Sequence, residues 1–142
     1  MSRANGQRNN SDTEENITQM AMTMKKTALI TGATSGIGEA CARKFAAGGY
    51  NLIITGRRAD RLEEIKTTLE AMGAKVVTLA FDVRDAEAAT KAIASLGEGW
   101  QEIDVLINNA GLALGLDKEY EGDPTDWNTM IDTNIKGLLT MT

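Results

Sequence analysis

The 142-residue chain contains no histidine, one cysteine and one proline, and aromatic residues make up only 4% of it. The lack of histidine rules out a histidine-based catalytic triad, and with one cysteine no metal site is expected. The single cysteine, Cys41, excludes an intrachain disulfide and favours a reducing, cytoplasmic location. Long apolar runs are absent and the net charge is −5, so neither a membrane nor nucleic acid is expected as a partner.

The composition divides the chain into two parts of different character. Residues 1–24 are rich in Asn, Ser, Thr and charged side chains and lack hydrophobic periodicity, which predicts a disordered N-terminal tail. The remainder, residues 25–142, has the balance of apolar and charged residues that is typical of one soluble globular domain. We therefore expect a single domain that begins near Lys25.

Within that domain, short apolar runs alternate with segments of helical periodicity. The expected strands are Lys26–Thr31, Asn51–Thr55, Lys75–Phe81 and Asp104–Asn108. Because these runs are continuously apolar, both faces of their sheet should be covered by helices. Repeated strand–helix units then predict an α/β fold with a doubly wound parallel sheet, the Rossmann fold. The pattern accounts for the first half of such a sheet and the start of the second, so we expect a fold truncated after the fourth strand and its following helix.

The first strand is followed by the glycine-rich sequence TGATSGIG, residues 31–38. In a Rossmann unit this turn brings backbone N–H groups and a helix N-terminus to a pyrophosphate. Gly32, Gly36 and Gly38 would permit the turn, the close approach and the packing of helix on strand. The loop lacks the Lys-Ser/Thr of a P-loop, which argues against ATP or GTP hydrolysis. A purely structural turn is the alternative.

Four motifs together resemble the short-chain dehydrogenase/reductase family, over residues 26–142. They are the glycine loop, Asp82-Val83 at the end of the third strand, Asn108-Asn109-Ala110-Gly111 after the fourth, and Asn134 in DTNIKG. The resemblance implies that the following residues bind the cofactor: Gly32, Ala33, Thr34, Ser35, Gly36, Ile37, Gly38, Asp82, Val83, Asn109, Ala110 and Gly111.

Within the family, the stretches TGRRADRLEE, NNAGLALG and DWNTMIDTNIKGL are closest to the NADP-dependent 3-hydroxy acid (serine-type) dehydrogenases. This resemblance implies hydride transfer between nicotinamide and a small hydroxy acid or another alcohol or carbonyl substrate. It also implies that the full-length protein is a homo-oligomer, a tetramer or a dimer.

The second strand ends in Gly56, Arg57 and Arg58, where NAD enzymes usually place an acid for the ribose hydroxyls. Guanidinium groups attract a 2′-phosphate, so this sequence predicts NADP as the cofactor, held by Arg57 and Arg58. The alternative is that both arginines are merely solvated. A methyltransferase on a similar fold would also be expected to carry an acid here, which Gly56 and Arg57 disfavour.

Asn134 falls in register with the apolar residues Trp127, Ile131, Leu138 and Met141. An amide in a buried stripe requires hydrogen-bond partners, so Asn134 is expected either to tie a neighbouring loop or, as the resemblance implies, to belong to the catalytic tetrad. Both roles remain open at this point.

The family's Tyr-x-x-x-Lys pair is missing from these 142 residues, because neither Tyr50 nor Tyr120 is followed by lysine four positions later. We therefore expect the 142-residue chain alone to be inactive. The competing interpretation is a non-catalytic NADP(H)-binding module.

Overall fold

Four parallel strands form the centre of the molecule in the computed structural model, which describes residues 10–114 and 121–142. The strands are β1 (Thr27–Ile30), β2 (Asn51–Gly56), β3 (Val76–Ala80) and β4 (Val105–Ile107), in the order β3-β2-β1-β4. In β1, Leu29 pairs with Ile53 on one side and with Leu106 on the other. The predicted parallel sheet is confirmed, and each end of each strand lies within one residue of its expected position.

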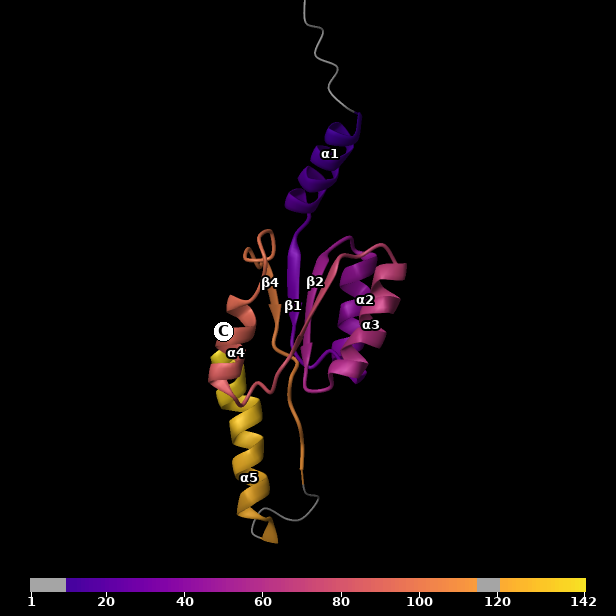
Figure 1. Ribbon diagram of the computed structural model, residues 1–142. Coiled ribbons are helices and arrows are strands. Elements are labelled where there is room, and N and C mark those ends of the chain that lie inside the picture. Colours follow the sequence, from indigo (N-terminus) through magenta and orange to yellow (C-terminus); the bar gives the residue numbers. More distant parts are fainter. Residues whose placement is uncertain (1–9, 115–120) are drawn as a thin grey trace, which may run out of the picture.

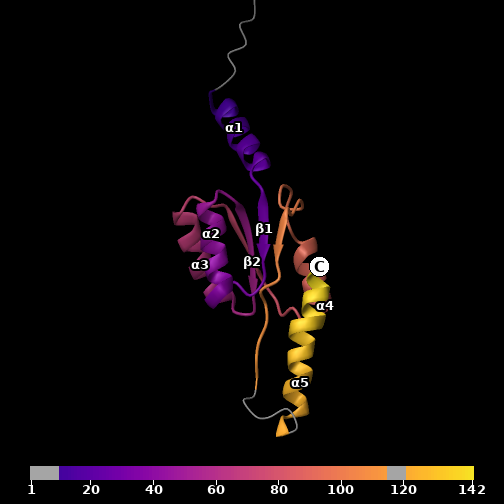
Figure 2. The same ribbon diagram turned by 180° about the vertical axis from the view of Figure 1, so that it is seen from behind.

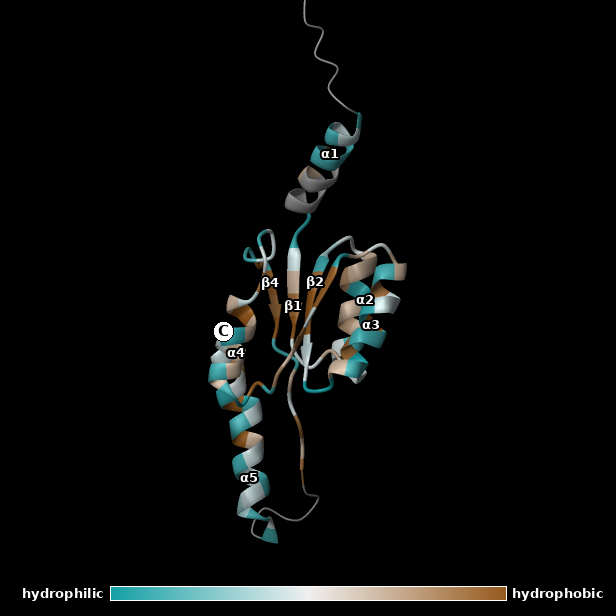
Figure 3. Ribbon diagram, in the orientation of Figure 1, coloured by the Kyte–Doolittle hydropathy of each residue, from teal (hydrophilic) through white to brown (hydrophobic). Residues whose placement is uncertain are grey.

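Helices cover both faces of this sheet, as the continuous apolar strands predict (Figures 1 and 2). On one face α2 (Gly36–Ala47) and α3 (Ala59–Ala71) pack on Ala28 and Ile30. On the other face α4 (Ala86–Ala94) packs on Leu29. The alternation along β1 follows from the two-residue repeat of a strand. Figure 3 shows mainly apolar residues in the lower parts of the strands and a mixture of hydrophilic and hydrophobic residues along the helices.

The last helical segment begins with a capped first turn. Asp123 caps α5 (Pro124–Ile131) by accepting a hydrogen bond of 2.8 Å from the Thr125 amide, and Pro124 occupies the first turn. The helix continues through a π-helical stretch, η2 (Asp132–Gly137), into α6 (Leu138–Met141). The π-helical stretch was not predicted.

The expected buried stripe on this helix is wrong for most of its members. Trp127, Ile131 and Leu138 are 41%, 44% and 41% exposed, whereas Thr133 and Gly137 are the buried residues. The inward face thus lies about one residue before the predicted one. Two causes act together: α5 projects beyond the carboxyl edge of the sheet (Figures 1 and 2), and the wider π turn interrupts the 3.6-residue repeat.

The expectation of disorder over residues 1–24 is also corrected. Residues 1–9 lie outside the described part of the chain, but residues 10–24 form the helix α1 (Asn10–Met24). The negative charge of Asp12 in the first turn interacts favourably with the positive end of the helix dipole. The hydrogen bonds within a helix also satisfy its backbone N–H and C=O groups without contacts to a core. The described side chains from Asn10 to Ile17 are exposed, and α1 extends away from the sheet (Figure 1). None of the helices in the described ranges has the length and hydropathy to cross a bilayer.

Candidate cofactor site

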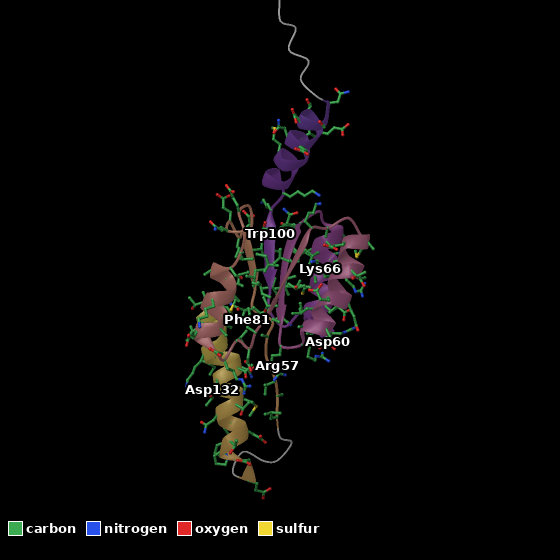
Figure 4. All side chains as sticks on the ribbon, viewed as in Figure 1. Arg57, Asp60, Lys66, Phe81, Trp100 and Asp132 are labelled. Atoms are coloured by element: carbon green, nitrogen blue, oxygen red, sulfur yellow. The ribbon has the colours of Figure 1, made fainter. Side chains whose placement is uncertain are left out.

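A cleft of about 370 Å³ opens at the carboxyl edge of the sheet. It lies between the ends of the neighbouring strands β1 and β4, after which the chain continues toward opposite faces of the sheet. Open α/β sheets bind ligands at such a point. Figure 4 shows Arg57 at this edge, between Asp60 at the start of α3 and Asp132 on η2. The lining residues are Gly32, Thr34, Ser35, Ile37, Thr55, Gly56, Arg57, Arg58, Phe81, Asp82, Val83, Arg84, Asn109, Ala110, Gly111, Leu112 and Thr133.

The glycine loop forms one wall of the cleft. Gly32 and Gly36 have φ angles of +64° and +56°, a left-handed conformation that favours glycine. A Cβ atom on Gly32 would lie 2.9 Å from the Cα of Ala110, and one on Gly38 would overlap the carbonyl oxygen of Gly32. The turn and the tight packing predicted for these glycines are therefore present.

The segment after β4 is bonded directly to the glycine loop. Asn109 donates from Nδ2 to the carbonyl oxygen of Gly32 at 3.0 Å. The buried Thr31 hydroxyl accepts a hydrogen bond of 3.0 Å from the Ala110 amide. The bonded residues are 77 and 79 positions apart in sequence. The Asn-Asn-Ala-Gly motif thus stabilises the glycine loop by direct hydrogen bonds.

Asn134 stabilises the same segment from η2. Its Oδ1 accepts a hydrogen bond of 2.9 Å from the Leu112 amide, and its Nδ2 donates to the Leu112 carbonyl oxygen at 2.8 Å. The tying role predicted for this asparagine is thus observed. Asn134 itself is outside the cleft lining, and its catalytic role stays a prediction.

Arg57 and Arg58 lie at the exposed rim of the cleft. Within residues 10–114 and 121–142, neither makes an ion pair. Gly56 beside them is buried, and a Cβ atom there would lie 2.5 Å from the Cγ2 of Thr34. A side chain at position 56 would therefore require the Thr34 side chain to move.

Asp82 is held by Arg84, which our sequence interpretation missed. The Arg84 backbone amide donates to Oδ1 at 2.9 Å, and its side chain donates from Nε and Nη2 to Oδ2 at 3.0 and 2.7 Å. Hydrogen bonding from Arg84 lowers the pKa of Asp82, and the charge of Arg57 adds to this effect. An ion pair between residues two positions apart has no reliable sequence signature. The one signal in the sequence is that Arg84 directly follows the Asp82-Val83 motif.

The remaining predicted cofactor residues divide into lining and supporting positions. Ala33, Gly36 and Gly38 are absent from the cleft lining, and Ala33 is buried with its amide bonded to the Thr55 carbonyl oxygen at 3.0 Å. Residues that line the cleft without having been predicted are Thr55, Gly56, Phe81, Arg84, Leu112 and Thr133.

The buried hydroxyl groups of Thr55 and Thr133 have no hydrogen-bond partner among the described residues. Buried polar groups normally find such partners. Together with the exposed guanidinium groups at the rim, they make the cleft suited to a polar, anionic ligand.

The strand order, the glycine turn at the strand-order reversal and the cleft above it define a dinucleotide-binding Rossmann fold. The family model for short chain dehydrogenases matches residues 26–142. The chain belongs to the short chain dehydrogenase family, and the resemblance drawn from its motifs is confirmed.

Several relatives are similar over the same region. A probable NADP-dependent dehydrogenase of Haemophilus influenzae is 55% identical over 82% of this chain and 45% of that protein. The NADP-dependent 3-hydroxy acid dehydrogenase of Salmonella typhi is 50% identical over 80% of this chain and 45% of that protein. The solved closed form of serine dehydrogenase complexed with NADP⁺ is 46% identical, with a TM-score of 0.74, over 81% of this chain and 45% of that one. The chain spans about half the length of these relatives.

Proposed function

We propose that this chain forms the cofactor-binding part of an NADP(H)-dependent oxidoreductase. The proposed reaction is hydride transfer between nicotinamide and a small hydroxy acid or another alcohol or carbonyl compound. The names of the relatives support both the cofactor and the substrate class. When bound, the nicotinamide supplies the hydride donor or acceptor.

The observation that carries the cofactor assignment is the rim formed by Gly56, Arg57 and Arg58. Two guanidinium groups without ion pairs in the described part of the chain lie beside a glycine against which the Thr34 side chain packs. A guanidinium group bonded to a phosphate contributes about 1.5–3 kcal/mol. An acid at position 56 would instead repel the 2′-phosphate that distinguishes NADP from NAD.

The other cofactor residues fit the remaining parts of a dinucleotide. The glycine loop, from Gly32 to Gly38, would hold the pyrophosphate with backbone N–H groups. Asp82 and Val83 would lie against the adenine, and Asn109 to Gly111 would line the side toward the nicotinamide. Asn134 would support this wall through Leu112.

Titration of the chain with NADP⁺ and with NAD⁺, followed by calorimetry, tests the assignment. We expect NADP⁺ to bind at least about tenfold more tightly, which corresponds to one charge-assisted hydrogen bond. Equal dissociation constants for the two cofactors would contradict NADP specificity, and absence of binding would contradict the cofactor site itself.

A non-catalytic NADP(H)-binding module is the second candidate, favoured by the lack of a Tyr-x-x-x-Lys pair in the 142 residues. NADPH oxidation with small 3-oxo acids and aldehydes separates the two, when the chain is compared with a version extended by the second half of a relative. We expect the 142-residue chain to be silent and the extended protein to turn over. Turnover at similar rates would contradict this division of roles, whereas silence of both would favour the binding module.

We also propose a cytoplasmic homo-oligomer, a tetramer or a dimer. The exposed apolar side chains of Trp127, Ile131 and Leu138 support an association surface on the last helix. Light scattering after size exclusion measures the mass, and a monomer at all concentrations would contradict the proposal.

A further inference from the structure

Arg61, near the start of α3, contacts three separate groups through its guanidinium nitrogens. Nε donates to the Thr34 carbonyl oxygen at 3.2 Å, Nη1 to Glu64 at 2.8 Å, and Nη2 to Glu39 on α2 at 3.3 Å. We propose that Arg61 is a positioning residue that orients the Thr34–Ser35 peptide for recognition of the 2′-phosphate of NADP. This inference rests on the proposed function.

The ion pairs of Arg61 separate its role from that of the rim arginines. Its charge is balanced by two carboxylates, Glu39 and Glu64, and the side chain is absent from the cleft lining. Arg57 and Arg58 line the cleft and, among the described residues, make no ion pair. Arg61 is therefore placed to hold protein, and the rim arginines to hold an anion.

Thr34 is restrained from two directions. Its carbonyl oxygen accepts the bond from Arg61, and its methyl group fills the space above Gly56. A trans peptide is planar, with its C=O and N–H groups on opposite sides. Holding the Thr34 carbonyl toward α3 therefore directs the Ser35 N–H away from Arg61, and both Thr34 and Ser35 line the cleft.

A Ser35 amide turned in this way would offer a backbone donor to the cleft, which Arg57 also lines. A 2′-phosphate bound at the rim would accept from the Ser35 amide as well as from the guanidinium groups. NAD has a hydroxyl group in place of the phosphate, so it depends less on the orientation of this peptide. Loss of the Arg61 bond should therefore weaken NADP binding more than NAD binding.

The test uses the full chain with Arg61→Ala and Arg61→Lys, and Arg43→Ala as the matched control. Arg43 also pairs with Glu39, at 3.0 Å, but no bond joins it to the glycine loop in the described residues. Calorimetry gives the NADP⁺ to NAD⁺ affinity ratio, and ¹⁵N relaxation without nucleotide gives the order parameters of the Ser35 and Gly36 amides.

We expect Arg61→Ala to lower the affinity ratio about tenfold, the effect of one charge-assisted bond. The order parameters of the Ser35 and Gly36 amides should fall toward about 0.6, the range of a mobile loop. Arg61→Lys should lower both quantities as well, because one ammonium nitrogen cannot replace three donors in a fixed fork. Arg43→Ala should leave both unchanged. If Arg61→Ala does not fold, Arg61→Lys alone decides the outcome.

Unchanged order parameters in the Arg61 variants would overturn the positioning role, whatever the nucleotides do. An equal loss of affinity for both nucleotides, with the ratio preserved, would overturn the link to the 2′-phosphate. If the unaltered chain binds neither nucleotide, the proposed function fails and the link to the 2′-phosphate fails with it, while the order parameters still decide whether Arg61 holds the loop.

Discussion

The side-chain amide of Asn134 pairs with both backbone groups of Leu112, accepting from its N–H at 2.9 Å and donating to its C=O at 2.8 Å. A neighbouring β-strand would make the same two hydrogen bonds with its backbone. Here one side chain from the π-helical stretch η2 makes both of them. It attaches the segment after β4 to η2, on the side of the cleft opposite the glycine loop. Asn134 therefore has a structural role that is independent of any part in catalysis.

Replacement of Asn134 by alanine should lower the free energy of unfolding by about 1–3 kcal/mol, because two hydrogen bonds are lost. Asn128→Ala is the control: this asparagine is exposed on α5 of the same helical segment. Urea denaturation measures both. Equal stability of the two variants would show that the Asn134–Leu112 pair does not stabilise the fold.

Gly56→Ala should destabilise the protein by about 1–3 kcal/mol, since the new methyl group would meet the Cγ2 of Thr34. Thr34→Ser removes that methyl group, so the double variant should recover much of the loss. A double-mutant cycle by thermal or urea unfolding gives the coupling energy. Additive effects would mean that Thr34 does not limit the space at position 56.

Arg57→Asp should reduce or reverse the preference for NADP⁺ over NAD⁺, because repulsion replaces attraction at the 2′-phosphate. We expect at least about a tenfold loss of NADP⁺ affinity, with NAD⁺ affinity nearly unchanged. Arg43→Asp makes the same charge change away from the cleft lining. A similar loss in that control would indicate a general electrostatic effect rather than a local contact.

The ion pair of Asp82 with Arg84 should make stability depend on pH in the acid range. The pKa of Asp82 is lowered from 3.8 in the folded protein, so its stabilising effect is complete above that value and is lost as the pH falls through the folded pKa. The difference in unfolding free energy between the native chain and Asp82→Asn should be constant near neutrality and shrink below pH 3.8. Acid titration of urea unfolding checks this, and a difference independent of pH would contradict it.

Removal of residues 1–23 should leave the melting temperature and nucleotide binding nearly unchanged. Although α1 is helical, its described side chains from Asn10 to Ile17 are exposed, and it extends away from the sheet. Thermal unfolding of the shortened and the full chain, compared by circular dichroism, measures the effect. A fall of several degrees would show that this segment packs on the domain.

The strands and the walls of the cleft could be predicted because their signals are local. Apolar runs mark the strands, and the cluster of glycines after the first strand marks the tight turn, where Gly32 indeed has a positive φ. The roles of Arg61 and Arg84 could not be predicted in this way. Their contacts depend on which segments the fold brings together, and a charged residue in a helix or loop is most often simply solvated.

The last helix illustrates a different limit. Its apolar spacing indicates one face, but the spacing assumes a constant 3.6-residue repeat, which the π turn at Asp132–Gly137 interrupts. The side that is buried, at Thr133 and Gly137, also depends on which segments the fold brings against the helix, such as Val83 beside Gly137. Neither the interruption nor these neighbours have a signal in the order of apolar residues.

The six-residue turn η2 contacts both loops that follow β3 and β4. Gly137 lies against Val83, where a Cβ atom would be 2.8 Å from Cγ2, and Asn134 is bonded to Leu112. The part of the cleft near Val83 and the part near Leu112 are therefore linked through one short segment. A shift of η2 along its axis would displace both parts together, so substitutions at Val83 and Leu112 should be thermodynamically coupled although the two residues do not lie on the same loop.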